Sequence, residues 1–177
     1  MATVYYTAAS LDGFIVDENK SLDWLVSRDI DADGPFAIDP FLASVGALVM
    51  GADTYEWILD NQPGEWMYPQ PSWVLTHRDG LVADGHDVQT FAGDVADLHP
   101  VLCAAAGDKL VHVMGGADVI RQALSAGYVE ELSISIAPVV LGGGKRLFDS
   151  FTETLNLEHM RTLQSPFATH ITYRVVR

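Results

Sequence analysis

The most constraining feature of the sequence is a pattern that occurs twice, in which an apolar run ends at glycine and a helical pattern follows. The first copy spans residues 47–51 and continues into a helix start at 53–58. The second spans residues 110–116 and continues into an amphipathic helix at 117–126. A continuous apolar run suits a parallel strand that is buried on both faces. Two such units predict an α/β fold with a parallel sheet.

The other local patterns extend this sheet and close it differently at the C-terminal end. Residues 36–44 and 94–106 are helical in pattern, whereas residues 17–35 are polar and read as a long loop, typical of a lid or binding loop. Residues 155–163 and 169–176 read as a closing antiparallel pair. The remaining strand-like runs are 3–9, 14–16, 72–76, 88–91 and 132–141. We therefore expect one α/β domain, residues 1–177, with a mixed, mostly parallel sheet and an antiparallel C-terminal edge.

Length and composition exclude several classes of protein. The 177 residues, of which 49% are hydrophobic, suit one globular domain with a sizeable core. A formal net charge of −14 repels a phosphate backbone, so nucleic-acid binding is not expected. No apolar run is long enough to span a membrane, and the first six residues read as a strand and not as a signal peptide. We therefore expect a cytoplasmic protein.

The sequence also argues against a metal site. Cys103 is the only cysteine, and it lies in an apolar run where it is interpreted as a small buried hydrophobic residue. The six histidines show none of the paired spacings that metal-binding helices use. No metal is expected.

Three strand ends carry residues suited to a phosphate-bearing ligand. At Gly51 and at Gly115-Gly116 a helix begins within two residues of the strand, so unpaired backbone N–H groups face outward. Directly after the strand at 72–76, His77 and Arg78 are side chains that can grip an adenosine phosphate. Because α/β sheets bind ligands beyond the carboxyl ends of their strands, the three turns together indicate a nucleotide crevice. Taken singly, each is also explained as a capped or solvated turn.

The common nucleotide and hydrolase motifs do not occur in the sequence. No G-x-G-x-x-G follows a strand, which argues against a Rossmann site. Gly144-Lys145-Arg146 is similar to the end of a phosphate loop, but Arg146 stands where that loop requires Ser or Thr. No G-x-S-x-G elbow is present, and a single cysteine cannot supply the zinc-deaminase signature. The nucleotide crevice would therefore be of another type.

Five short motifs follow one another along the chain. They are Ala8-Ala9-Ser10-Leu11-Asp12-Gly13-Phe14-Ile15, Leu22-Asp23-Trp24-Leu25, Met50-Gly51 with Thr54-Tyr55-Glu56, Met114-Gly115-Gly116-Ala117, and Ala137-Pro138-Val139-Val140-Leu141-Gly142-Gly143-Gly144. The set resembles the bacterial dihydrofolate-reductase-like family that also contains the reductase domain of the bifunctional riboflavin-biosynthesis protein. The resemblance implies a three-layer α/β/α fold and hydride transfer from a nicotinamide cofactor to a C=N or C=O bond.

Carried over by position, the resemblance implies where the cofactor would lie. Backbone groups of Ala8 would hold the nicotinamide carboxamide, with Ile15 against the ring. Residues 12–24 would form a lid, with Asp12 at its base and Trp24 on its far side as the candidate catalytic residues. The residues implied along the rest of the cofactor are Gly51, Asp53, Thr54, Leu75, Thr76, His77, Arg78, Met114, Gly115, Gly116, Ala117, Asp118 and Val119.

One departure from the family pattern concerns the choice of cofactor. Relatives commonly carry an arginine directly after the first glycine, where it reads the 2′-phosphate of NADPH. This chain has Ala52 at that position. NADPH stays the expected cofactor if Arg78 or His77 compensates, and NADH is possible.

A second departure concerns the proton donor. Dihydrofolate reductases keep a buried acid before the Met-Gly turn, and the usual spacing falls near Pro35-Phe36 in this chain. Asp33 and Asp39 are the neighbouring acids. The absence of an acid at the corresponding position favours the pyrimidine-reductase branch over folate reduction, and water is an alternative proton source.

Three functions remain open from the sequence. The first is a stand-alone reductase of a small pyrimidine- or pterin-like heterocycle, similar to 5-amino-6-(5-phosphoribosylamino)uracil reductase. The second is dihydrofolate reductase, and the third is a non-catalytic nucleotide-binding module on the same fold. The riboflavin branch also implies a homodimer, and residues 138–148 are interpreted as a hairpin turn or a dimer contact.

The second glycine turn yields a direct test. Gly115→Val should abolish cofactor binding, because a side chain would block the approach of the ligand to the backbone. Binding is measured by calorimetry on protein whose folding has been checked by circular dichroism. Retained affinity would mean that this turn faces no ligand.

Overall fold

The computed structural model describes residues 2–28, 34 and 37–177. The strands are β1 Thr3–Ser10, β2 Phe14–Val16, β3 Val45–Gly51, β4 Ser72–Leu75, β5 Val88–Phe91, β6 Leu110–Gly115, β7 Val129–Ala137, β8 Lys145–Arg146, β9 Asn156–Gln164 and β10 Thr169–Val176. The helices are α1 Asp23–Val26, α2 Ile38–Ser44, α3 Ala52–Asn61, α4 Val95–Ala106 and α5 Ala117–Ser125. None of these described helices has the length and apolarity needed to cross a membrane.

Eight strands form one mixed sheet in the order β5-β4-β3-β6-β1-β7-β10-β9. Every neighbouring pair from β5 to β7 is parallel, whereas β10 runs antiparallel to both β7 and β9. The predicted α/β class, with a mostly parallel sheet and an antiparallel C-terminal edge, is confirmed. Parallel pairing needs a crossover between strands, which the helices α3, α4 and α5 provide.

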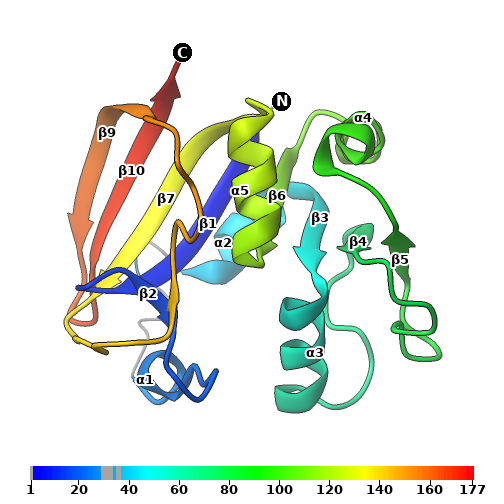
Figure 1. Ribbon diagram of the computed structural model, residues 1–177, viewed down its shortest axis with the longest axis horizontal. Coiled ribbons are helices and arrows are strands. Elements are labelled where there is room, and N and C mark those ends of the chain that lie inside the picture. The colour runs from blue at the N-terminus through cyan, green and yellow to red at the C-terminus, as the bar shows by residue number, and fades with distance from the viewer. Residues whose placement is uncertain (1, 29–33, 35–36) are drawn as a thin grey trace.

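Helices cover both faces of the sheet, because successive side chains of a buried strand point to opposite sides. In β3, Ala47 and Val49 pack with Leu102 of α4 and Ile120 of α5 in one core. The alternate residues, Leu48 and Met50 among them, join a second core with side chains of α2 and α3. Figure 1 shows α5 in front of the sheet and α2 behind it. The three-layer α/β/α arrangement expected from the resemblance is therefore present.

Two of the differences from the sequence prediction concern α1 and β7. Residues 23–26 form α1 inside the predicted loop, where Trp24 and Leu25 pack on residues far away in the chain. β7 begins at Val129 and ends at Ala137, earlier than the predicted run of 132–141. Pro138 follows directly and has no N–H to donate to a ladder, so the chain turns there.

His112 of β6 is a polar residue within the apolar interior. Its side chain stacks edge-on against Phe41 of α2 with 4.8 Å between ring centroids, and its Nε2 lies 3.3 Å from the Tyr6 carbonyl oxygen. Nδ1 is buried and has no hydrogen-bond partner among the described residues. Burial lowers the pKa of His112 to about 4, so the ring is neutral in the folded protein near neutral pH.

This buried histidine predicts a loss of stability in acid. An exposed histidine in the unfolded chain takes up a proton near its ordinary pKa of about 6.5, whereas the folded chain resists protonation down to about pH 4. The free energy of unfolding should therefore fall from about pH 6.5 toward pH 4, by up to about 3 kcal/mol more in the wild type than in His112→Gln. Urea denaturation at several pH values measures it, and identical pH dependence in both proteins would contradict it.

Candidate functional site

A cleft opens at the edge of the sheet where the parallel strands end. Because β1, β3, β4, β6 and β7 run in one direction, their carboxyl ends meet at this edge. The cleft has a volume of about 980 Å³, which suits a small-molecule or cofactor site. It is bounded by residues 15–22, by α3, by the start of α5, and by Gly144 and Lys145.

The two strand-to-helix turns touch each other at the floor of the cleft. A Cβ atom on Gly116 would lie only 3.3 Å from the Gly51 Cα, and the positive φ of Gly116, 77°, also favours glycine. A Cβ atom on Gly51 would lie 3.4 Å from a methyl group of Val119. Gly115 has a φ of 149° and faces the Thr54 hydroxyl. Gly116 is therefore required by the close approach of two backbone segments and by its positive φ, whether or not a ligand is bound, and the positive φ of Gly115 favours glycine at that position.

The first turns of α3 and α5 supply hydrogen-bond donors to this region. Gly51 and Gly116 are the N-cap residues of the two helices, and neither helix has a side-chain cap bond within the described chain. The first backbone N–H groups of a helix have no partner inside the helix, and the helix dipole adds positive potential there. Thr54 and Ala117, next to these caps, line the cleft. The arrangement can bind a phosphate group through backbone donors.

The lid segment and the glycine-rich segment 138–148 form one unit over the cleft. Strands β2 and β8 pair as a small antiparallel sheet, and the Leu147 N–H donates to the Gly13 carbonyl oxygen at 2.9 Å. The Arg146 guanidinium stacks on the ring of Phe14, 4.7 Å from its centroid. Segment 138–148 is thus fixed to the lid of its own chain, and a dimer contact through this segment stays a prediction.

Asp12 holds this unit to the end of β1. Its carboxylate accepts hydrogen bonds from the Ser10 hydroxyl at 2.6 Å and from the backbone N–H groups of Leu141 at 3.1 Å and Gly142 at 2.8 Å. The Ser10 bond, followed by the two backbone donors, lowers the pKa of Asp12 to about 2. Asp12 is therefore ionised at neutral pH, and its contacts favour a positioning role, while a catalytic role for it stays a prediction.

Trp24 lies in α1, which packs against the turn between β9 and β10. Trp24 and Leu25 contact a small apolar cluster of Ala137, Phe167 and Ala168. The indole Nε1 is buried and has no hydrogen-bond partner in the described part of the chain. Packing accounts for the position of this side chain, and its catalytic role stays a prediction.

The cleft is acidic. Six carboxylates line it against two ammonium groups; the acids are Asp17, Glu18, Asp53, Glu56, Asp60 and Asp149, and the bases are Lys20 and Lys145. The Lys145 Nζ reaches across to the Asp53 Oδ2 at 3.7 Å. Among the described residues, no three of the histidine, cysteine or acidic type gather closely enough to hold a metal ion. An anionic ligand therefore depends on the two lysines and the two helix starts for attraction.

The third predicted turn lies beside α3. Arg78 follows β4, and its two terminal nitrogens donate to the two carboxylate oxygens of Glu56, each at 2.9 Å. The Thr76 hydroxyl accepts a bond from the Arg78 backbone N–H at 3.1 Å. His77 is exposed. The Arg78 side chain is therefore already engaged by a carboxylate of the chain.

The structure brings part of the predicted cofactor site together. The predicted residues in the cleft lining are Ile15, Asp53, Thr54, Gly116 and Ala117. The buried residues directly behind them are Gly51, Gly115 and Val119. The predicted residues outside the lining are Ala8, Asp12, Trp24, Leu75, Thr76, His77, Arg78, Met114 and Asp118.

Several lining residues escape the sequence prediction. Lys20, Glu56 and Lys145 are the clearest, because each is charged and faces the cleft. The signal for Lys145 is present in Gly144-Lys145-Arg146, but its pairing with β2 has no sequence signature. Of the acids considered as proton donors, Asp39 is exposed in the first turn of α2, and Asp33 and Pro35-Phe36 lie outside the described residues.

Comparison with known proteins places these observations in a family. The pattern of the RibD C-terminal domain family matches residues 68–169. The chain is 28% identical to the uncharacterized protein YwjB of Bacillus subtilis, over 97% of this chain and 96% of that protein. A protein of Shewanella sp. PV-4 named for riboflavin biosynthesis has a TM-score of 0.88 and 28% identity, with both chains fully covered. Dihydrofolate reductase of Enterococcus faecalis, solved with NADP(H), shares the fold with a TM-score of 0.65 and 18% identity, over 98% of this chain and 96% of that one.

The Asp12 contacts predict a local effect of substitution. Asp12→Ala should release the backbone N–H groups of Leu141 and Gly142, because their acceptor is removed. Amide hydrogen exchange of these two residues should accelerate on the order of tenfold, the factor that corresponds to roughly 1.4 kcal/mol in local opening. The exposed Asp84 provides the control substitution Asp84→Ala, and equal exchange in both variants would contradict the positioning role.

Proposed function

This chain belongs to the RibD C-terminal domain family, and we propose that it is a nicotinamide-dependent reductase of a small pyrimidine- or pterin-like heterocycle. The observation that carries the proposal is the convergence of the α3 and α5 starts on one cleft through the contact of Gly51 with Gly116. A dinucleotide needs such a run of backbone donors for its pyrophosphate. The family consists of reductases, which supports this reaction class over a purely structural role.

The residues of the cleft fit part of the cofactor. Backbone N–H groups at Asp53, Thr54 and Ala117 would hold the pyrophosphate, and glycine at position 116 leaves the approach open. Ile15, from the lid, offers an apolar contact for the nicotinamide ring. The bound cofactor would supply the hydride, and the protein would supply its orientation. The 2′-phosphate of NADPH is matched less well, because Ala52 carries no charge and Arg78 is engaged.

The lid would cover the bound cofactor in a position that the contacts of Asp12 fix. Asp12 fixes the 138–148 segment to the end of β1, and β2 and β8 carry this link to Lys145 on the cleft wall. Since the pKa of Asp12 is about 2, its carboxylate has no proton to give at neutral pH. We therefore assign protonation of the substrate to water that enters beside the lid.

The substrate is a heterocycle of low negative charge. The named activity that resembles this one best, 5-amino-6-(5-phosphoribosylamino)uracil reduction, handles a phosphorylated substrate. Six carboxylates and two lysines at the cleft disfavour such an anion. We propose that the chain works in the cytoplasm as a homodimer on an uncharged or weakly charged member of this class. Dihydrofolate reduction and a non-catalytic nucleotide-binding role are the alternatives.

A parallel titration with NADPH and NADH tests the proposal. Wild-type protein should bind at least one of the two cofactors with a dissociation constant below about 1 mM, the range usual for enzyme ligands. Calorimetry measures binding, and cofactor oxidation on addition of reduced-pterin and aminopyrimidine candidates measures activity. Dihydrofolate turnover with methotrexate inhibition would favour dihydrofolate reductase. Binding without turnover of any candidate would favour the non-catalytic role, and folded protein that binds neither cofactor would exclude the reductase.

A further inference from the structure

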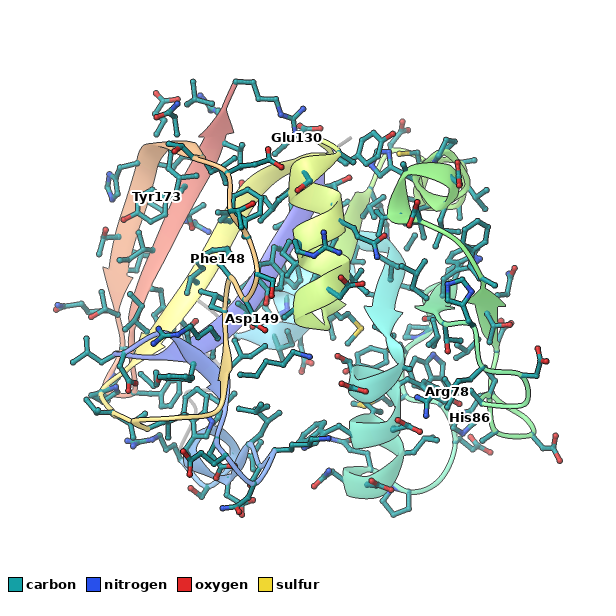
Figure 2. The ribbon with its side chains drawn as sticks, viewed as in Figure 1. Arg78, His86, Glu130, Phe148, Asp149 and Tyr173 are labelled. Atoms are coloured by element: carbon teal, nitrogen blue, oxygen red, sulfur yellow. The ribbon has the colours of Figure 1, made fainter. Side chains whose placement is uncertain are left out.

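A carboxylate–guanidinium pair stands at the corner between α3 and the loop after β4. Arg78 Nη1 and Nη2 donate to Glu56 Oε1 and Oε2, each at 2.9 Å, in the two-bond geometry that arginine forms with carboxylates. Figure 2 shows the labelled Arg78 beside α3. Both side chains are about half exposed, so a ligand in the cleft can reach the pair.

Glu56 is the member of the pair that faces the cleft. It lies one turn after the start of α3, on the same side of the helix as Ala52. Glu56 lines the cleft, whereas Arg78 reaches its rim only through Glu56. Asp53 adds a second negative charge near Arg78, and Lys20 lies near Glu56. The hydrogen bonds from Arg78 lower the pKa of Glu56, so the carboxylate stays ionised.

The direction of a bound dinucleotide follows from the two walls of the cleft. Toward β1 the lining presents apolar side chains of Ile15 and Val16, which suit a nicotinamide ring that must stay dry. Toward β4 it presents Glu56 and, through it, Arg78. β4 pairs directly with β3, and Leu75 lies opposite Gly51, so this wall adjoins the pyrophosphate position. The adenosine ribose therefore falls beside the Glu56–Arg78 pair.

Beside this ribose, a carboxylate favours NADH, whereas a guanidinium favours NADPH. In dinucleotide sites a carboxylate accepts a bond from the free 2′-hydroxyl of NADH, whereas an arginine accommodates the 2′-phosphate of NADPH. When the two terminal nitrogens of an arginine donate to a carboxylate, the same two hydrogen bonds are not available to a phosphate. The nearby charge of Asp53 repels a phosphate further.

We propose that Glu56 sets the cofactor preference of this chain by withholding Arg78 from the 2′-phosphate, so that NADPH gains no advantage over NADH. The inference rests on the proposed function, because it requires a dinucleotide in the cleft. It runs against the NADPH preference expected from the resemblance. Wild-type protein should bind the two cofactors with affinities within about threefold of each other.

The decisive variant is Glu56→Gln, which keeps the shape and the helix propensity but removes the charge. Affinity for NADPH should rise on the order of tenfold, as expected when one charge-assisted hydrogen bond becomes available, and NADH affinity should stay constant or fall. The same contrast should appear between adenosine 2′,5′-bisphosphate and adenosine 5′-monophosphate, which probe the adenosine end alone. Calorimetry and competition with a fluorescent adenine nucleotide report binding without any turnover.

Two control variants distinguish the release of Arg78 from a general effect of removing a negative charge. Glu158→Gln removes a glutamate of β9, 57% exposed against 42% for Glu56, that pairs with Arg174 of β10 on the other side of the sheet from β4 (Figure 1). It should leave the NADPH-to-NADH ratio unchanged. In an Arg78→Ala background, Glu56→Gln should no longer raise NADPH affinity, because no guanidinium is released.

The outcomes distinguish this inference from the proposed function. An unchanged ratio in Glu56→Gln, or an equal gain in the Arg78→Ala background, overturns the role of Glu56 while dinucleotide binding stands. A wild-type preference for NADPH of more than tenfold overturns it as well. Failure of all four ligands to bind any folded variant removes the proposed function and the inference together.

Discussion

Two strand-to-helix turns of this fold meet backbone to backbone, and the contact depends on the absence of a Cβ atom at Gly116. A Cβ atom on Gly116 would lie 3.3 Å from the Gly51 Cα, closer than real side chains usually pack. The contact brings the starts of α3 and α5 to one place, so their unpaired N–H groups converge on a single cleft. Glycine here serves the architecture first, and the convergence of the two helix starts on the cleft is a consequence.

The sequence predicts the elements whose signals are local and misses those stabilised from a distance. The apolar runs at 47–51 and 110–116 are predicted correctly, because a short continuous apolar run is by itself a signal for a buried strand. The helix α1 has four residues and no periodic signal, and it forms because Trp24 packs against Phe167 and Ala168, which are more than 140 positions away. The end of β7 moves for a local reason that the apolar pattern conceals, the missing N–H of Pro138.

The residues of the candidate site likewise fall into those that the sequence predicts and those that it does not. Gly116 and Thr54 are predictable because a strand-to-helix turn is specified by residues that are neighbours in the sequence. The partner of Arg78 is not, because Glu56 lies 22 residues earlier on a separate helix and only the β3–β4 pairing brings them together. The Asp12 carboxylate likewise accepts hydrogen bonds from backbone N–H groups 129 and 130 positions away, and these contacts give it a structural role that the sequence does not reveal. Sequence identifies which groups are present, and tertiary pairing decides which of them are free to act.

The negative charge of the chain limits which ligands its cleft can attract. A protein with a formal charge of −14 and an acid-lined cleft attracts an anion only through groups that its own carboxylates leave unsatisfied. Arg78 and Lys145 each lie near a carboxylate of the chain, whereas the first N–H groups of α3 and α5 have no side-chain cap among the described residues. In the proposed complex, these backbone groups would bind the pyrophosphate that all nicotinamide dinucleotides share, and they would not distinguish an additional phosphate on the ribose. In the proposed complex, the choice of cofactor therefore depends on the rim of the cleft, where Glu56 engages the Arg78 guanidinium through two hydrogen bonds.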